Sequence, residues 1–135
     1  MFEDICKIYK NFMNEDFVTY ELAVKLEEKG FDEPCYGYYH CNGGNDSFEL
    51  CGNGDRDFRN SKNQYRVAAP TIPQVLKWLR NTYNLHVETY PCVLGMWKFL
   101  VTNITTLEER ALCDKYTSSE QAAIAGVNYC LENLI

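Results

Sequence analysis

Apolar residues recur at helical spacing in four stretches of the chain: residues 2–13, 19–31, 69–83 and 117–135. An apolar residue at every third or fourth position forms one continuous stripe along a helix, as in a helix that packs on a core. In the first stretch the stripe consists of Phe2, Ile5, Tyr9 and Phe12. The pattern therefore predicts four amphipathic helices.

The second of these helices has signals at both ends. Thr19 can cap a helix N-terminus with its side-chain hydroxyl. Gly30 suits the left-handed C′ position of a Schellman ending, which places Phe31 at C″ in contact with Leu26 at C3. We therefore expect this helix to begin directly after Thr19 and to end just before Gly30.

Capping boxes predict where the last two helices begin. Thr71 and Gln74 form a T-x-x-Q box, with Pro73 in the first turn, where its missing N–H does little harm. Thr117 and Glu120 form a second box. Two apolar stripes are expected to face the core: Ile72, Val75, Leu76, Leu79 and Tyr83 in one helix, and Ala123, Val127, Cys130, Leu131 and Leu134 in the other.

Other stretches predict strands and loops. The aromatic-rich runs CYGYYHC and SFELC flank NGGND, whose residues tolerate positive φ, and this arrangement is typical of a β-hairpin. Residues 52–66 are rich in Gly, Asn, Asp and Ser and predict a long loop. Further strands are expected in LHVETY, in MWKFLVTNI after a turn between Pro91 and Gly95, and as a short edge strand in RALCDKY.

These elements together predict an α+β fold, in which amphipathic helices pack on a small, mostly antiparallel sheet in the manner of an α-β-α sandwich. A chain of 135 residues buries roughly two-thirds of its unfolded surface, which is enough for one core. We therefore expect a single domain over residues 1–135.

The charge and hydropathy of the chain exclude some classes of partner. Its net charge is −6 and the acidic residues are scattered, so general nucleic-acid binding, which needs a basic face, is not expected. No stretch approaches the roughly 20 apolar residues of a membrane span. The first residues, MFEDICKIYKNF, lack the layout of a signal peptide. The expected location is the cytoplasm.

The cysteines are odd in number and have no pairing rhythm. In the absence of a secretion signal, we expect them to be reduced thiols that act as small hydrophobic residues. They are Cys6, Cys35, Cys41, Cys51, Cys92, Cys113 and Cys130.

The stretch EPCYGYYHCNGG, residues 33–44, is the best candidate for a metal site. Its ligands would be Cys35, His40, Cys41 and Cys51, but this spacing matches no paired zinc-knuckle pattern. In a regular strand Cys35 and Cys41 lie about 20 Å apart, at roughly 3.3 Å per residue, and neighbours such as His40 and Cys41 point to opposite faces. A hairpin is therefore the better interpretation, and no metal or cofactor is expected. A contact between Cys35 and Cys51 across the hairpin stays open.

No catalytic residue is predicted with any specificity. His40 and His86 could each meet one of seven cysteines, and so many candidate pairs make each of them weak. The common nucleophile, zinc-protease, phosphate-loop and dinucleotide motifs are absent from the sequence. An enzyme that uses a Cys–His pair is the least favoured hypothesis.

The loop carries a basic and aromatic island, which stands out on an acidic chain. Its cations and rings could grip a phosphate-bearing small molecule or a nucleotide. A solvated loop whose charges keep it soluble is the preferred interpretation, and ligand binding is the alternative. The residues of this island, our candidate ligand-binding residues, are Arg56, Phe58, Arg59, Lys62, Tyr65 and Arg66.

A resemblance to known proteins is carried by FVTYELAVKLEEKGFDEPCYGYY, APTIPQVLKWLRNTYNLHVETY and YTSSEQAAIAGVNYCLENLI. The chain, from about Phe17 to Ile135, resembles a group of small uncharacterised proteins of phages, prophages and mobile elements of gut Bacteroides. More distantly, it looks like the phage α-β-α sandwich domain. The resemblance implies that residues 1–16 are an N-terminal extension, but it identifies no site residue.

Two functions follow as expectations. The first is a non-enzymatic accessory protein of a phage or mobile element that binds a host or phage protein in the bacterial cytoplasm. The ten tyrosines of the chain suit a protein interface, because the tyrosine ring packs while its hydroxyl stays hydrated. The alternative is an anti-defence protein that binds a nucleotide-like small molecule, for which a homo-oligomer enclosing the ligand is expected.

Overall fold

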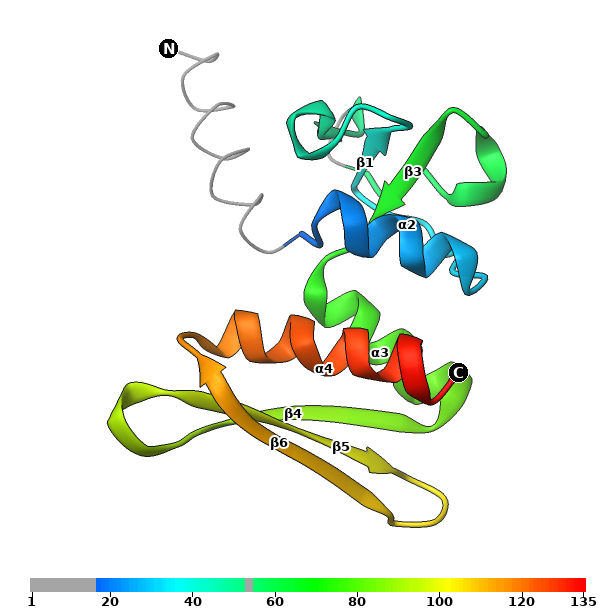
Figure 1. Ribbon diagram of the computed structural model, residues 1–135. Coiled ribbons are helices and arrows are strands. Elements are labelled where there is room, and N and C mark those ends of the chain that lie inside the picture. Colours follow the sequence, from blue (N-terminus) through cyan, green and yellow to red (C-terminus); the bar gives the residue numbers. More distant parts are fainter. Residues whose placement is uncertain (1–16, 53–54) are drawn as a thin grey trace. The chain divides into compact units, whose positions relative to one another are not determined.

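The computed structural model describes residues 17–52 and 55–135, and of residues 111–115 the backbone alone. The chain divides into two compact units, Met1–Thr71 and Ile72–Ile135, and each contains its own three-stranded antiparallel sheet (Figure 1). The helix expected in residues 2–13 and the extension 1–16 lie outside the described residues. The expectation of a single domain stays a prediction.

The predicted α+β class is confirmed. The described residues form three α-helices and two small antiparallel sheets. In each unit a helix packs on the sheet. In the first unit helix α2 (Tyr20–Glu28) packs on strand β3 (Arg66–Ala69). In the second unit helix α4 (Ser119–Asn133) packs on strands β4 (Leu85–Pro91) and β5 (Trp97–Asn103). The sequence predicted one small sheet, whereas the structure has two sheets of three strands each.

Helix α2, Tyr20–Glu28, has the predicted ends. The Thr19 hydroxyl accepts a hydrogen bond from the Leu22 N–H at 3.3 Å. At the other end Gly30 has φ +89°, and its N–H bonds to the Glu27 carbonyl while the Phe31 N–H bonds to the Leu26 carbonyl. This is the hydrogen-bond pattern of a Schellman motif, which satisfies carbonyls that the helix itself leaves open.

The first sheet has the order β2-β1-β3. Strand β1, Gly37–His40, pairs with β2, Glu49–Leu50, and this confirms the predicted hairpin. On its other side β1 pairs with β3, Arg66–Ala69, over four residue pairs from Gly37↔Ala69 to His40↔Arg66. Strand β3 was not predicted. It begins at Arg66, the last residue of the predicted loop. Its two alanines carry little strand propensity, so its pairing depends on the distant β1.

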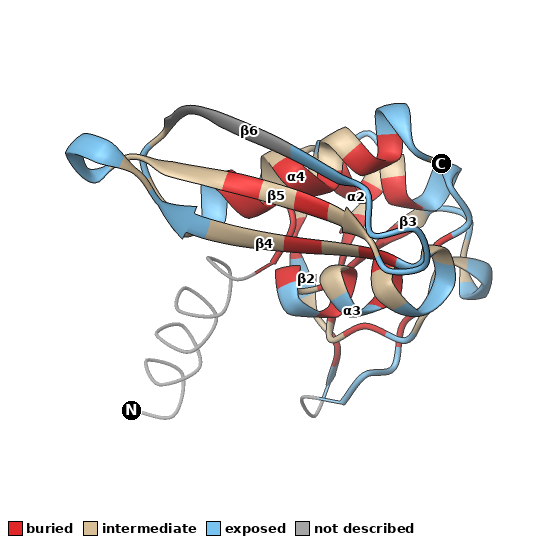
Figure 2. Ribbon diagram, turned by 90° about the horizontal axis from the view of Figure 1, so that it is seen from below, coloured by how far each residue is buried: buried red, intermediate tan, exposed pale blue. Residues whose placement is uncertain are grey.

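The second unit consists of helix α3, Ile72–Tyr83, strands β4, Leu85–Pro91, β5, Trp97–Asn103, and β6, Glu109–Tyr116, and helix α4, Ser119–Asn133. The strands form a meander in the order β4-β5-β6, with β6 at an edge as predicted. Burial alternates along β4 and β5 (Figure 2), with Val87, Phe99 and Val101 on the face that packs against α4.

The predicted capping box of the last helix is wrong by one residue. Ser118 is the N-cap and accepts a hydrogen bond from the Gln121 N–H at 3.1 Å. The Gln121 side-chain oxygen in turn accepts from the N–H and the hydroxyl of Thr117, at 3.1 and 2.9 Å. The sequence TSSEQ contains two overlapping boxes, and β6 runs on to Tyr116, so the second box is used and Glu120 has no capping role.

The predicted apolar stripes are mostly buried. In α3, Ile72, Val75 and Leu79 are buried as expected, and Trp78 joins them. The structure contradicts the burial expected of Leu134, which is 40% exposed because α4 ends at Asn133 and leaves it as the C-cap. Among the described residues, no helix combines the length and the apolar character needed to cross a membrane.

Gly126 lets α4 lie close to its sheet. A Cβ at this position would stand 2.7 Å from Cγ1 of Val87 and 3.2 Å from the ring of Phe99. Val87 is β-branched and cannot easily turn that methyl group away. The absence of a side chain at Gly126 therefore sets the distance between α4 and the inner face of β4 and β5.

We predict that Gly126→Ala lowers the free energy of unfolding by about 1–2 kcal/mol, because the overlap outweighs a gain of about 1 kcal/mol in helix propensity. Chemical denaturation measures this change. In a Val87→Ala background, which removes the offending methyl group, the same substitution should be neutral or stabilising. An equal loss in both backgrounds would show that close packing at Val87 is not the cause.

Candidate functional site

Strand β1 sends alternate side chains to opposite faces of the first sheet. Tyr39 and Tyr38 are both buried, on opposite faces of the strand, and Tyr36 lies directly before the strand. Tyr39 contacts residues inside the unit and has a structural role. Tyr38 lies under an arginine at the edge of a hollow and is a candidate for a binding role.

Tyr39 anchors the strand from within the unit. Its hydroxyl donates a hydrogen bond to the Val18 carbonyl at 2.5 Å. Its ring packs edge-on against Tyr20 at 5.7 Å and against Phe48 at 5.4 Å between centroids. Because the side chain is buried, its neutral form is favoured and its pKa is raised to about 12.

The opposite face of β1 carries tyrosines covered by arginines. The Arg56 guanidinium lies 4.9 Å from the centre of the Tyr36 ring, and that of Arg66 lies 4.5 Å from the centre of the Tyr38 ring. The Tyr38 hydroxyl donates to Glu49 on β2 at 2.8 Å. The pKa of Tyr38 is raised, mainly by burial and to a smaller extent by the Glu49 carboxylate. One cation–π contact therefore joins β3 to β1, and the other joins the loop to Tyr36, directly before β1.

A hollow of about 270 Å³ opens beside this face, and we call it the Arg66 hollow. Polar donors and aromatic rings share its wall. It is lined by Tyr38, Cys51, Gly52, Asp57, Phe58, Lys62, Asn63 and Arg66. The hollow is the described feature of the first unit that is most suited to a small anionic ligand.

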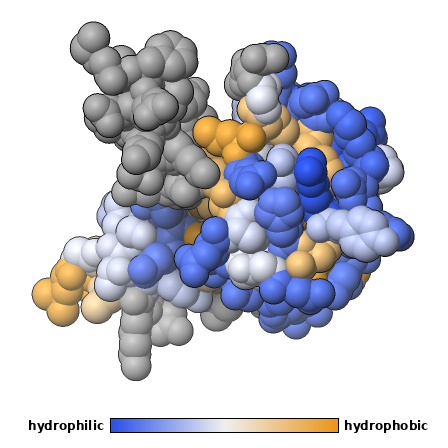
Figure 3. Space-filling model, turned by 90° about the horizontal axis from the view of Figure 1, so that it is seen from above, coloured by the Kyte–Doolittle hydropathy of each residue, from blue (hydrophilic) through white to orange (hydrophobic). Residues whose placement is uncertain are grey.

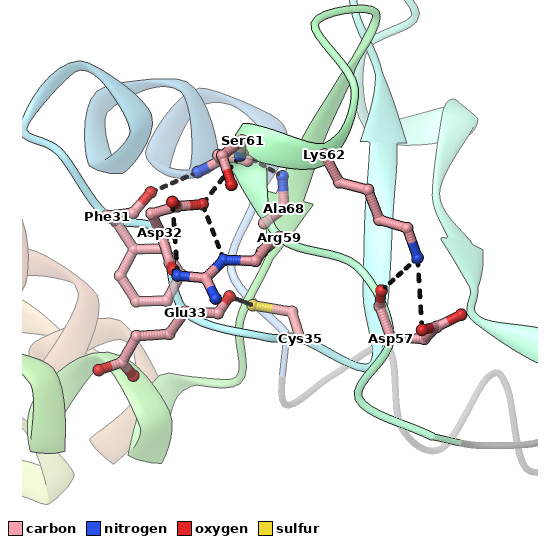
Figure 4. A network of polar contacts seen from close by, with 10 residues as sticks. Phe31, Asp32, Glu33, Cys35, Asp57, Arg59, Ser61, Lys62 and Ala68 are labelled. Atoms are coloured by element: carbon pink, nitrogen blue, oxygen red, sulfur yellow. Dashed lines mark hydrogen bonds and ion pairs between the residues drawn. The ribbon is translucent and has the colours of Figure 1, made fainter.

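Three of the six candidate ligand-binding residues line the hollow, namely Phe58, Lys62 and Arg66. Phe58 is a buried wall residue, whose ring lies 5.2 Å from that of Tyr38. Lys62 reaches the backbone carbonyl of Asp57 at 3.0 Å and its carboxylate at 3.3 Å (Figure 4). The structure thus brings half of the predicted island to one place.

The other three candidates are held elsewhere. Arg59 bonds to the carbonyl of Asp32 and pairs with its carboxylate at 3.4 Å (Figure 4). A hydrogen bond from the Ser61 N–H, with a contribution from Arg59, lowers the pKa of Asp32. Arg56 covers Tyr36, and the Tyr65 side chain is 71% exposed. These three residues shape the loop and are not part of the wall of the hollow.

Sequence reasoning missed Tyr38 and Asn63 as residues of the site. Tyr38 reaches it because β3 pairs with β1 and brings Arg66 opposite His40, next to the tyrosine. Asn63 lies inside the predicted loop and was passed over because it carries no charge. Its position in a run that contains Lys62 and Arg66 is the one signal that could have found it.

The cysteines near the hairpin do not gather around one point. The Cys51 thiol donates to the Cys35 carbonyl at 3.4 Å, so the two residues meet, and both are free and buried. Cys41 is exposed and donates to the Gln64 carbonyl, while His40 lies 3.4 Å from Glu49. Within residues 17–52, 55–110 and 116–135, no group of three or more His, Cys, Asp or Glu side chains could hold a metal ion.

A second surface lies at the end of the β4–β5 hairpin. Val93 and Leu94, in the 3-10 turn between the strands, are 77% and 94% exposed. Leu94 has φ +58°, in the left-handed region. This conformation is uncommon for residues with a branched apolar side chain, which gain no local hydrogen bond there.

Next to this turn, the sheet of the second unit carries an apolar hollow of about 410 Å³. It is lined by Tyr90, Pro91, Lys98 and Leu100. The Lys98 ammonium lies 5.9 Å from the centre of the Tyr90 ring. The turn lies at the left of Figure 1, and the corresponding edge of the space-filling view is hydrophobic (Figure 3). We call Val93, Leu94 and the four lining residues the hairpin surface.

We predict that the buried hydroxyl of Tyr39 makes the protein less stable at alkaline pH. In the unfolded chain tyrosine ionises near pH 10, about two pKa units below its folded value. Burial of the neutral hydroxyl contributes its full stability below pH 10. Between pH 10 and 12 this contribution is lost, which lowers the free energy of unfolding by about 2–3 kcal/mol in total. Urea unfolding at a series of pH values measures it.

Tyr39→Phe provides the control for this prediction. The variant should be less stable at neutral pH by about 1–3 kcal/mol, because the buried Val18 carbonyl loses its donor. Its stability should fall less steeply above pH 10 than that of the wild type. Cys130, whose pKa burial also raises to about 12, affects both proteins alike. Parallel pH profiles for the two proteins would contradict the assignment.

Comparisons of the chain with protein-family models, with curated proteins and with solved structures found no match. The functional proposals below therefore rest on the geometry of the hairpin surface and of the Arg66 hollow.

Proposed function

We propose that this protein is a non-enzymatic binding module that docks on another protein through its hairpin surface. The observation that carries the proposal is Leu94, a leucine with 94% of its surface exposed in a left-handed backbone conformation. Such a residue is unfavourable for the isolated chain in two ways, through its backbone and through its exposure. A partner that covers the side chain would remove the second of these costs.

The energies involved are large enough to matter. A left-handed conformation costs a residue with a Cβ about 1–2 kcal/mol. Burial of an exposed leucine side chain contributes about 1.5–3 kcal/mol. Glycine at position 94 would avoid the backbone cost, and the next residue, Gly95, already has φ +73°. Folding does not require leucine at this turn, and contact with a partner would account for it. Leu107 has a similar backbone conformation and exposure, so the hollow beside Leu94 is the feature that distinguishes the two turns.

The surroundings of Leu94 have the features of a binding hot spot. Val93 extends the apolar projection, and the hollow beside it has a volume within the range of about 300–1,000 Å³ that is typical of ligand pockets. Tyr90 and Lys98 stand at its rim, and an aromatic ring beside a cation suits an interface. We infer that an apolar side chain of the partner fills the hollow, while Leu94 enters the partner.

The resemblance to phage, prophage and mobile-element proteins supplies the setting of the proposal. The protein would act in the cytoplasm of a Bacteroides host as an accessory protein of the element, and its partner would be a host or phage protein. Binding of a nucleotide-like small molecule is a second candidate function. The Arg66 hollow favours it, and that hollow shares no residue with the hairpin surface.

The test uses a photo-crosslinking amino acid at position 94 of the full chain, expressed in Bacteroides cells. The expected result is a covalent adduct with one specific protein. Leu107 supplies the matched control position, because it is 73% exposed with φ +63°. The hollow next to its turn is smaller, about 160 Å³, and has the charged side chains of Glu108 and Arg110 in its lining. The same adduct from both positions, or an adduct with a second copy of this chain, would contradict the proposal.

We predict opposite effects of Leu94→Gly on stability and on binding. The free energy of unfolding should be unchanged or higher by up to about 1 kcal/mol, because glycine accepts a positive φ. Affinity for the purified partner should fall at least tenfold, as measured by calorimetry, and Leu94→Asp should weaken binding further. Leu107→Gly should show the same stability change with unchanged affinity. Equal losses of affinity in the two glycine variants would exclude a specific role of the hairpin surface.

A further inference from the structure

We infer that the Arg66 hollow binds a small phosphate monoester, up to the size of a mononucleotide. This inference rests on the second candidate function above and gives its ligand a chemical class, and it is independent of the docking function of the hairpin surface. The inference rests on the donors that line the hollow, on the weakness of their present partners and on the size of the space.

Arg66 provides the principal donor. Its guanidinium covers the face of the Tyr38 ring, and no described carboxylate pairs with it. A guanidinium stacked on a ring keeps its N–H groups at the edge, where two of them can bond to two oxygens of one phosphate. The ring contact also fixes the side chain in place, so that less conformational entropy is lost on binding.

Asn63 adds a neutral donor beside Arg66. Its side-chain oxygen accepts a hydrogen bond from the Tyr65 N–H at 2.8 Å. This bond orients the amide and leaves its NH₂ group without an acceptor among the described residues. A phosphate oxygen in the hollow would supply that acceptor.

Lys62 is the third donor, and its present partner can be replaced. Its ammonium lies 3.3 Å from the Asp57 carboxylate, and the two side chains are 54% and 70% exposed. An exposed pair of this kind contributes little to stability, so a phosphate can compete for the ammonium. The Asp57 carboxylate repels an anion in the hollow. The charged residues of the lining are therefore two cations, Lys62 and Arg66, and one carboxylate.

Size and charge point to a small molecule in place of a nucleic acid. The volume of about 270 Å³ lies just below the range of about 300–1,000 Å³ that is typical of sites for drug-sized ligands. A polyanion would also meet the net charge of −6 that the whole chain carries. Salt screens such distant charges beyond about 10 Å at 0.1 M, so a compact anion responds mainly to the donors in the hollow.

The experiment is a titration of the isotope-labelled full chain with inorganic phosphate and, separately, with adenosine 5′-monophosphate, followed by NMR chemical shifts at constant ionic strength. We expect saturable shifts at Asn63, Arg66 and their neighbours with either probe. Tighter binding of the nucleotide would show that the ring of the ligand contributes, whereas equal binding would assign the affinity to phosphate alone. Shifts with neither probe would overturn the inference.

Two arginines that each cover a tyrosine ring, Arg66 at the start of β3 and Arg56 in the loop, form a matched pair of variants. Arg66→Gln should weaken phosphate binding at least tenfold, whereas Arg56→Gln, which removes a similar cation from above Tyr36 outside the hollow, should change it less than twofold. Equal losses in the two variants would indicate a general charge effect and would overturn the site.

Asp57→Asn tests the same site without removing a donor. Loss of the opposing carboxylate should tighten phosphate binding severalfold, and this outcome is independent of whether Arg66→Gln folds. Unchanged or weaker binding in Asp57→Asn would contradict the inference. Neither variant touches the hairpin surface, so failure here leaves the docking function to its own test.

Discussion

The first unit depends on the register of strand β1. Its alternation places Tyr39 in the core, where the hydroxyl bonds to the Val18 carbonyl, and Tyr38 on the opposite face beneath Arg66. Strand side chains have a period of two, so a slip by one residue would exchange these faces. If Tyr38 moved into the place of Tyr39, Gly37 would replace Tyr38 and the Arg66 hollow would lose that ring. In the other direction His40 would replace Tyr39, and the Val18 carbonyl would lose its tyrosine donor. One constraint therefore maintains both the core of the unit and its proposed ligand site.

In the second unit, one helix packs closely on the middle of the sheet, whereas the turn at the end of the β4–β5 hairpin is exposed. Gly126 allows α4 to approach Val87 and Phe99 on the inner face. The end of the same β4–β5 hairpin presents Leu94 with almost its whole surface exposed. A sheet that one helix covers tightly can carry an unfavourable turn, because the packing that stabilises the unit does not involve the turn. The hairpin surface is therefore available for a partner without weakening the core.

Local signals in the sequence predicted most of the fold, and features that depend on distant pairing were missed. The ends of α2 follow from Thr19 and Gly30, which act within a few residues of their partners. Strand β3 was missed because its short run of small residues becomes a strand only by pairing with β1. The same pairing positions Arg66 beside Tyr38, and this proximity could not be predicted from the loop sequence alone. The left-handed conformation of Leu94 has no signal in the sequence, because the neighbouring Gly95 could have accommodated the turn alone.

The most direct test of the account is the register of β1 in solution, measured from cross-strand backbone NOEs in isotope-labelled protein. The structure predicts that Tyr38 lies opposite Ala68 and that His40 lies opposite Arg66. These NOEs would place Tyr39 and Tyr38 on the faces that the core and the hollow require. NOEs that place Tyr38 opposite Val67 would contradict the account, because the two faces of the strand would then be exchanged.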